Sequence, residues 1–404
     1  MTFELRYGDG DTVCVDLPPE VVGDYSRPRG KPVEDPIRAV ETALNDPLNF
    51  PSLAQAIMPG DRVVLAVDHL VPQLSSVIAG VVERLLASSA LPHEITIVLA
   101  NKEDLKRDPL QRLAPEVREQ IQIEIHDSTQ IDRLAYLAAS RDGKPVYFNR
   151  TICDADVVVP IGVLRSDGSW GYVGVHGCLF PTFSDQATQE RFRTPRTDWR
   201  AHQRHNCKEA GEAAWLLGVQ FTLQITPGPG DSMLHVLAGD AQTVAQRGQE
   251  LYESAWLHHA ARKASLVVAT IEGAEPTQTW DNFTRALLAA SEAVSDGGSI
   301  VLCTKLQQPP GTSVQRLADI NDGEELLRNL KGDRSADAFT ARLLAQTLDR
   351  AQVFLLSLLA EETVEDLGLG HVSCPDEVTR LSRKHDSCIL VGNAQHALVA
   401  TEEE

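Results

Sequence analysis

Short apolar runs alternate along the chain with segments whose apolar residues recur at helical spacing. Residues 62–68 and 95–100 are such runs, and between them apolar residues recur at helical spacing over 74–85. This pattern predicts a strand, a helix and a strand, a unit that favours a parallel sheet. Further predicted strands lie at 121–125, 144–149, 157–161 and 220–226, and residues 35–45, 104–120 and 241–261 are predicted to be mainly helical.

A second alternation of the same kind begins at residue 265. Its predicted strands lie at 266–271, 299–303, 352–356, 388–391 and 397–400, and its predicted helices at 280–294 and 336–349. At the N-terminus, strand-like residues 3–7 and 12–15 flank a turn of glycine and aspartate and predict a hairpin, which a polar, proline-containing linker follows. We therefore predict an α/β fold with two α/β domains, 1–262 and 263–404, whose sheets are largely parallel.

Composition and charge narrow the class of protein. The length of 404 residues corresponds to two or three domains of usual size. With 57 acidic and 37 basic residues the formal net charge is −20, so a nucleic acid would meet a repulsive field. No signal-peptide pattern is visible and no apolar run approaches the roughly 20 residues of a membrane helix, so a cytoplasmic protein without a membrane partner is expected. The 7 cysteines are scattered and form no CxxC pair, which favours reduced core thiols.

Candidate chemistry follows from where the predicted strands end. In open parallel sheets, ligands bind beyond the carboxyl ends of the strands, which places Asp68, His69, residues 101–103 and the loop after Ile161 in one crevice. That loop is part of 157–185, a stretch rich in glycines that also holds a histidine, a cysteine and two prolines. Glycines allow a sharp turn or a close approach to a ligand. The alternative is a long loop that only connects two halves of the sheet.

Several segments, taken in order and with compatible spacing, together resemble the nickel-dependent lactate racemase family. They are Asp68-His69 with Pro72, the strand at 155–159, the GYVG and Pro181 block, Leu237 to Asp240 before a long helix, and Gly297-Gly298 before a strand. The resemblance covers nearly the whole chain and implies two α/β domains with an active-site cleft between them. It also implies racemisation or epimerisation of a 2-hydroxy acid by hydride transfer to a nickel pincer nucleotide, with two histidines as acid and base.

When the family's functional positions are carried over residue by residue, this chain has different chemical groups at many of them. The arginine that the family places between Asp68-His69 and Pro72 is Val71 here. The two catalytic histidines fall at Glu103 and Asp167, and the lysine that tethers the cofactor falls at Gly177, which cannot form the thioamide link. The nickel-ligand histidine falls near Arg193. The implied catalytic residues are Glu103, Asp167 and, beside the tether position, His176; the implied cofactor-binding residues are Asp68, His69, Gly174, Gly177 and Pro181.

The resemblance also implies the partner. A small anionic organic acid or nucleotide would contact Arg193, Asn282 and Arg285, of which the last two correspond to the family's Gln-x-x-Lys. Three hypotheses follow: a racemase or epimerase that uses the nickel pincer nucleotide, an enzyme with different acid–base chemistry on the same scaffold, and a non-catalytic protein that binds a nucleotide or organic acid. The second hypothesis uses Asp68, Glu103, Asp167 and His176 as acid and base groups.

Two further clusters carry alternative interpretations. His202, His205 and Cys207 could bind a transition metal, although histidines of a polar helix are more often solvated. His176 with Cys178 could form a nucleophile pair, although the loop between them has no predicted shape. The sequence contains no nucleophile elbow, dinucleotide-binding fingerprint or P-loop lysine motif. Apart from the candidate cluster of His202, His205 and Cys207, the sequence identifies no metal ligands, and it makes no prediction of oligomeric state.

Overall fold

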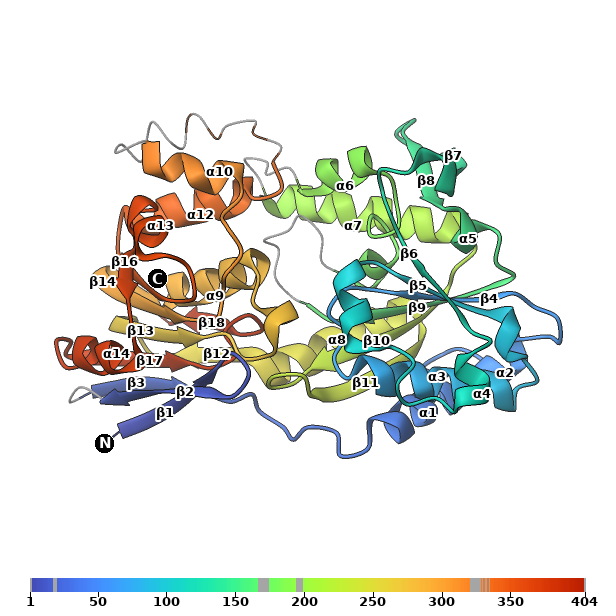
Figure 1. The fold of residues 1–404 in the computed structure, drawn as a ribbon, viewed down its shortest axis with the longest axis horizontal. Coiled ribbons are helices and arrows are strands. Elements are labelled where there is room, and N and C mark those ends of the chain that lie inside the picture. The colour runs from blue at the N-terminus through green and yellow to red at the C-terminus, as the bar shows by residue number, and fades with distance from the viewer. Residues whose placement is uncertain are drawn as a thin grey trace. The chain divides into compact units, whose positions relative to one another are not determined.

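The computed structural model divides the chain into two compact units. It describes residues 2–16, 20–165, 174–193, 199–319, 328, 330, 333 and 335–402, so the predicted site residue Asp167 lies outside the described part. The central unit is made mainly of residues 31–252, and the flanking unit mainly of residues 1–30 and 253–404. Each unit is built on its own sheet (Figure 1).

The central unit contains a six-stranded sheet in the order β11-β10-β9-β4-β5-β6. All neighbouring pairs are parallel except β10 and β11, which are antiparallel. The strands are β4 (Val63–Val67), β5 (Ile95–Leu99), β6 (Gln122–Ile125), β9 (Val157–Val163), β10 (Phe221–Pro227) and β11 (Met233–Asp240). β4 is buried along its whole length, as its unbroken apolar run predicts for a strand covered on both faces.

Helices cover both faces of the central sheet (Figure 1). On one face, residues of α1 and α3 such as Leu44 and Ile78 join the strands in one buried cluster. On the other, Phe148, Phe180 and Phe192 pack with small residues of α7. The helices are α1 (Pro36–Asn45), α2 (Leu53–Ala56), α3 (Leu74–Ala87), α4 (Pro115–Arg118), α5 (Arg150–Cys153), α6 (Gln186–Arg193), α7 (Trp199–Leu216) and α8 (Ala241–Trp256). The 3-10 turns are η1 (Pro92–Glu94), η2 (Lys102–Arg107), η3 (Ile131–Arg133) and η4 (Val175–Cys178), and β7 (Leu134–Ala139) pairs with β8 (Pro145–Asn149).

The flanking unit contains a second six-stranded sheet, which is parallel throughout, in the order β16-β15-β14-β13-β17-β3. Its first strand in sequence, β3, comes from the N-terminal residues and pairs with β17 near the other end of the chain. The strands are β3 (Glu20–Tyr25), β13 (Ala264–Thr270), β14 (Val294–Cys303), β15 (Gln352–Leu356), β16 (Gly370–Val372) and β17 (Ser387–Val391).

The N-terminal hairpin packs on one face of this second sheet. Leu5, Val13 and Val15 of the hairpin share a buried cluster with the strands and with Val378. β1 (Thr2–Tyr7) and β2 (Asp11–Asp16) are antiparallel, and β12 (Leu257–Ala260) forms a separate parallel pair with β18 (Leu398–Thr401). The remaining elements are α9 (Trp280–Ala293), α10 (Thr312–Gln315), α12 (Ala338–Leu348), α13 (Glu361–Asp366), α14 (Pro375–Ser382), η5 (Glu275–Thr277) and η6 (Arg316–Asp319).

The predicted α/β class with two largely parallel sheets is confirmed, and most predicted elements are present. The prediction of helix over 104–120 is largely wrong, because Pro109 and Pro115 interrupt it and only η2 and α4 form. The helix predicted over 241–261 ends at Trp256, where β12 begins. The linker predicted after the hairpin contains β3, and β7 and β11 were not predicted.

The two compact units differ from the predicted domains 1–262 and 263–404. Residues 1–30 belong with the C-terminal part of the chain, because β3 completes the flanking sheet and the hairpin covers it. The boundary predicted between residues 262 and 263 lies instead at Glu253, within α8, where the chain passes from the central unit to the flanking unit. A pairing between distant strands of this kind leaves no local signal in the sequence.

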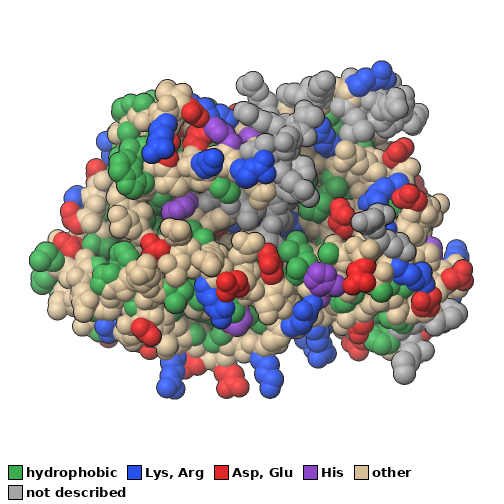
Figure 2. Space-filling model, turned by 180° about the vertical axis from the view of Figure 1, so that it is seen from behind, with side chains coloured by type: hydrophobic (Ala, Val, Ile, Leu, Met, Phe, Trp, Pro, Cys, Tyr) green, Lys and Arg blue, Asp and Glu red, His purple; other side chains and the backbone are tan. Residues whose placement is uncertain are grey.

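The structure bears on three expectations from the sequence, which concern surface charge, membrane helices and the cysteines. On the described part of the face drawn in Figure 2, acidic and basic side chains are interspersed. None of the helices in the described segments combines the length and apolar character needed to cross a membrane. The seven cysteines are free, and burial raises the pKa of Cys178, Cys303 and Cys388 to about 12, as expected for core thiols.

A buried histidine makes the flanking unit sensitive to acid. His258 in β12 is 2% exposed and stacks on Tyr25, with ring centroids 4.6 Å apart. Burial, assisted by Arg29 and His259, lowers the pKa of His258 to about 4. As the pH falls, His258 is therefore protonated in the unfolded chain before it is protonated in the folded protein. Stability is lost between its ordinary pKa of about 6.5, which applies to the unfolded chain, and its pKa of about 4 in the folded protein.

Replacing His258 with phenylalanine is expected to remove this acid sensitivity. Between pH 7 and pH 5 the titration of His258 should lower the free energy of unfolding by about 2 kcal/mol. Urea unfolding of the unaltered protein and of His258→Phe at both pH values measures this difference. The exposed His93 provides the control, because His93→Phe should keep the original pH dependence. Identical pH dependence in His258→Phe would contradict the assignment.

Candidate active site

The central sheet changes its direction of growth between β4 and β9. From β4 the chain adds β5 and β6 on one side, and it then returns to add β9 and β10 on the other. In open α/β sheets the crevice beyond the carboxyl ends at such a point is the usual ligand site. Asp68 and His69 directly follow β4, and Arg165 follows β9, so the sequence brings an acid, an imidazole and a guanidinium to this edge.

Arg165 joins the ends of the two strands. Its NH1 lies 3.2 Å from Oδ2 of Asp68, and its NH2 donates to the backbone oxygen of His69 at 2.8 Å. The other oxygen of Asp68 accepts from the backbone nitrogen of His69 at 2.8 Å. Arg165 remains 29% exposed, and these two bonds occupy only part of its five N–H donors. It can therefore bind a ligand carboxylate as well.

His69 is held by a buried carboxylate from the next strand. Its Nδ1 lies 2.9 Å from Oδ2 of Asp104, whose side chain is 1% exposed. Asp104 lies in η2 directly after β5, where Asn101 caps the turn by accepting from the backbone nitrogen of Glu103. Because an ionised carboxylate only accepts, Nδ1 carries the proton and Nε2 is the basic nitrogen. The imidazole is 28% exposed, which allows a ligand to reach it.

A second arginine extends the chain of contacts. NH1 of Arg107 lies 3.4 Å from Oδ1 of Asp104, and NH2 lies 2.7 Å from Oδ1 of Asp231 in the turn between β10 and β11. Asp231 also accepts from the backbone nitrogen of Gln73 at 3.2 Å. The contacts thus run from the loop after β4 through η2 to the turn after β10.

Backbone conformation marks the same region. Leu70 and Gln73, after β4, have φ values of 59° and 50°, and Asp108, after Arg107, has a φ of 42°. Left-handed conformations cost energy for residues other than glycine and persist where the surrounding contacts hold them. The loops that carry His69 and Arg107 are therefore held in place by their contacts.

Glu103 lies next to this arrangement but is engaged elsewhere. Its carboxylate forms an ion pair with Lys106. The bond to Lys106 holds the pKa of Glu103 below its usual range, and nearby His69 acts in the same direction. A carboxylate with a lowered pKa is a weaker base. The position that the resemblance assigns to a catalytic histidine is thus one residue before the carboxylate that holds His69.

The segment 174–181 lies on one face of the central sheet. Gly174 precedes η4, Gly177 accepts a hydrogen bond from Thr182 at its backbone oxygen, and Pro181 follows a cis peptide bond. His176 packs near Gly211 of α7, and burial lowers its pKa, although Asp240 opposes this shift. Cys178, next to them, is buried, and its raised pKa makes it a poor nucleophile.

The residues predicted to bind an anion lie in different units. Arg193 ends α6 in the central unit and is exposed. Asn282 and Arg285 lie on α9 of the flanking unit. Asn282 is 4% exposed, donates to the backbone oxygen of Thr277 at 2.7 Å and accepts from Arg285 at 2.8 Å. Its amide therefore serves the start of its own helix.

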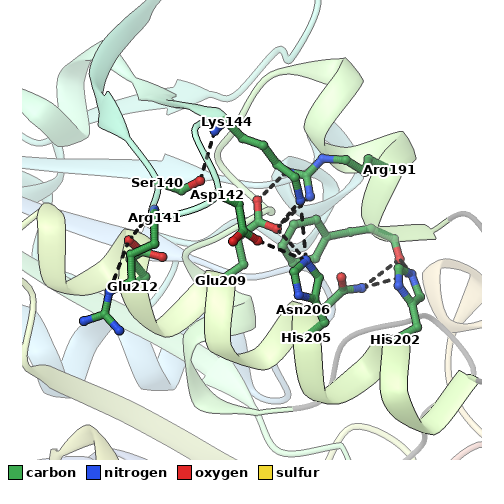
Figure 3. A network of polar contacts seen from close by, with 11 residues as sticks. Ser140, Arg141, Asp142, Lys144, Arg191, His202, His205, Asn206, Glu209 and Glu212 are labelled. Atoms are coloured by element: carbon green, nitrogen blue, oxygen red, sulfur yellow. Dashed lines mark hydrogen bonds and ion pairs between the residues drawn. The ribbon is translucent and has the colours of Figure 1, made fainter.

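The histidines of α7 take part in a separate ion-pair network. In Figure 3, Arg191 and Lys144 both contact the carboxylate of Glu209. Glu209 is 6% exposed; Arg191 binds it through both terminal guanidinium nitrogens, and Nζ of Lys144 lies 3.1 Å from it. His205 lies 3.6 Å from Glu209, whereas His202 contacts the backbone oxygen of Phe192 at 3.3 Å.

The hypothesis of a metal site at His202, His205 and Cys207 needs correction. Within the described residues, no group of three or more His, Cys, Asp and Glu side chains is placed to hold a metal ion. His202 and His205 contact different partners, the backbone oxygen of Phe192 and the carboxylate of Glu209. The network instead ties α6 and α7 to the β7–β8 hairpin.

Sequence reasoning found Asp68 and His69 but missed four members of the site at the carboxyl edge of the central sheet. One of them is Arg165, which follows β9. Asp104 and Arg107 follow β5 within the segment that was predicted to be helix, and Asp231 follows β10. The same rule that selected Asp68, that ligands lie beyond the carboxyl ends of parallel strands, would have selected all four. For Asp231 the added signal is the turn sequence Pro-Gly-Pro-Gly at 227–230.

Comparisons with known proteins agree with this architecture. Residues 7–192 match the family model of the lactate racemase N-terminal domain. The lactate racemase apoprotein from Thermoanaerobacterium thermosaccharolyticum has a similar structure, with a TM-score of 0.78 and 17% identity over 99% of this chain and 100% of that one. A protein from Thermotoga maritima has a TM-score of 0.64 and 13% identity over 92% and 99%. No curated protein matches the sequence. At these identities the structural likeness shows the fold alone.

Proposed function

We propose, from the premise that residues 7–192 belong to the lactate racemase N-terminal domain family, that this chain catalyses proton transfer on a small 2-hydroxy carboxylate. The observation that carries the proposal is the bond between Nδ1 of His69 and the buried carboxylate of Asp104, 2.9 Å long, beside the partly exposed Arg165. The name of the family supplies the substrate class. The edge of the central sheet supplies the acid–base group.

The chemistry uses only residues of this chain. Arg165 binds the substrate carboxylate, and Nε2 of His69 removes the proton from C2, the carbon next to that carboxylate. The electrons of the C2–H bond pass into the carboxylate, where the guanidinium stabilises the added charge. Asp104 stabilises the imidazolium that forms. Return of the proton from His69 to the same face restores the substrate. Because the imidazolium can exchange its proton with water before this return, a solvent proton can replace the original one at C2.

The residues present do not fit the tethered nickel pincer nucleotide that the family resemblance implies. Gly177 stands at the position of the tethering lysine, and its backbone is hydrogen-bonded within η4 and to Thr182. Arg193, near which the nickel-ligand histidine of the family falls, is exposed. Among the described residues, no metal-binding group of three or more side chains is present. The proposed reaction therefore contains no step through that cofactor.

Proton exchange with solvent tests the proposal. The purified protein is incubated in D₂O with D- and L-lactate and with larger 2-hydroxy carboxylates, and the C2 proton is followed by ¹H NMR. We expect deuterium to replace the C2 proton, and His69→Gln to slow this exchange at least ~100-fold because the base is lost. The exposed His93→Gln is the control and should exchange at the original rate.

Each other result contradicts the proposal in a different way. Inversion of configuration without deuterium at C2 would show hydride transfer, as in the chemistry that the family resemblance implies. Binding of a hydroxy acid without exchange would show a non-catalytic binding protein. Exchange that persists in His69→Gln would place the base elsewhere.

A further inference from the structure

The turn between β10 and β11 reaches the site through a single carboxylate. Asp231 lies 2.7 Å from NH2 of Arg107, whose side chain is 17% exposed, and accepts from the backbone nitrogen of Gln73 at 3.2 Å. One side chain thus holds both the loop that follows His69 and the arginine that follows Asp104. Gln73 has a left-handed backbone, so the bond from Asp231 also holds a residue in a costly conformation.

Arg107 stands between two carboxylates and binds them unequally. Its contact with Asp231 is 2.7 Å, whereas its contact with Asp104 is 3.4 Å. Asp104 in turn divides its two oxygens, with Oδ2 on His69 at 2.9 Å and Oδ1 towards Arg107. If Arg107 lost Asp231, its guanidinium would turn to Asp104, because a bidentate pair with a buried carboxylate is the strongest bond then open to it. That pair would compete with His69 for the carboxylate.

We propose that Asp231 is a positioning residue: by holding Arg107 it keeps the carboxylate of Asp104 on Nδ1 of His69. The role rests on the proposed function, because it serves the orientation of the base. The bonds of Asp231 go to Arg107 and Gln73 and not to Asp104 or His69, and its side chain is 57% exposed. Its effect reaches the imidazole through Arg107, which makes it distinct from a residue that binds substrate.

The orientation of His69 can be measured without a substrate. In ¹⁵N-labelled protein, long-range ¹H–¹⁵N correlation spectra give the protonated nitrogen of each histidine, and His69→Gln identifies the signal of His69. We expect a single Nδ1–H form in the unaltered protein and a mixture of the two tautomers in Asp231→Ala. In the exchange assay, kcat should fall roughly tenfold in this variant while KM stays the same, because orientation rather than binding is lost.

A matched ion pair provides the control. Asp108, the residue after Arg107, pairs with Arg118 at 2.9 Å. The side chain of Arg118 is 47% exposed. Arg118→Ala should leave the tautomer of His69 and the exchange rate unchanged. If Asp231→Ala does not fold, Asp231→Asn answers the same question, since it keeps an acceptor for Gln73 but lacks the charge that holds Arg107.

The outcomes separate this role from the proposed function. A single Nδ1–H tautomer that persists in a folded Asp231 variant overturns the positioning role and leaves the proposed function standing. A mixture of tautomers already in the unaltered protein contradicts the bond between His69 and Asp104, and with it the proposed function. A mixture of His69 tautomers and a slower exchange in Arg118→Ala as well would assign the effect to the loop as a whole. This result would also overturn the specific role of Asp231.

Discussion

Replacing Asp104 with asparagine should slow the exchange of the C2 proton by roughly 1,000-fold. An amide can donate as well as accept, so the side chain introduced by Asp104→Asn would offer its N–H to Nδ1 of His69. The ring would then carry its proton on Nε2 and would no longer be a base on the side of the substrate. Substrate affinity should change little, because Arg165 and its bond to Asp68 are untouched.

The measurement compares kcat and KM for deuterium exchange in the unaltered protein and in the variant. The ¹⁵N spectrum should show the Nε2–H tautomer of His69 in Asp104→Asn. Asp104 is 1% exposed, so a stability measurement must accompany the kinetics. A folded variant that exchanges protons at the original rate would rule out His69 as the base that Asp104 orients.

Substituting alanine for Gly239 should lower the free energy of unfolding by more than about 4 kcal/mol. Gly239 lies in β11 with a φ of 142°, and a Cβ there would lie 2.2 Å from the backbone oxygen of Leu48 and 2.6 Å from its backbone nitrogen. These backbone atoms cannot move away, because Leu48 is bonded to Ala238 and Asp240 on either side of the glycine. Both the conformation and the space therefore require glycine.

A substitution at Gly218 separates the energy lost through backbone conformation from the energy lost through the steric clash. Gly218 has a φ of 81°, and a Cβ there would meet nothing within 4 Å. Gly218→Ala should thus cost only the conformational part, about 1 kcal/mol. Guanidinium unfolding of both variants gives the comparison. Equal losses in the two variants would show that the approach of Leu48 to β11 is not rigid.

The sequence predicts the layers of this fold better than it predicts their connections. Apolar runs such as 62–68 and 95–100 become buried parallel strands, since each must be covered on both faces. β3 could not be predicted in the same way, because its residues are partly exposed at the edge of a sheet and its partner lies at the far end of the chain. Long-range pairing of an edge strand has no periodic signal.

The site was predictable where it depends on strand ends and unpredictable where it depends on side-chain direction. Asp68 and His69 follow an apolar run, and that alone places them at the carboxyl edge. Whether Glu103 or Asp104 faces His69 depends on how a 3-10 turn begins after β5, and Asn101 sets this by capping the turn. The family resemblance places the catalytic position at Glu103. The cap instead directs Asp104 inwards to His69, and Glu103 forms an ion pair with Lys106.

The pairing of β3 with β17 has a consequence for synthesis. β3 is synthesised before the central unit, and its parallel partner β17 follows only after the whole of that unit has been made. The strands of the central sheet come from one continuous stretch, so they can pair while β3 still has free backbone groups. An unpaired strand is a template for other chains. β3 is therefore open to pairing with other chains until β17 has been made, and slow translation beyond residue 252 prolongs that exposure.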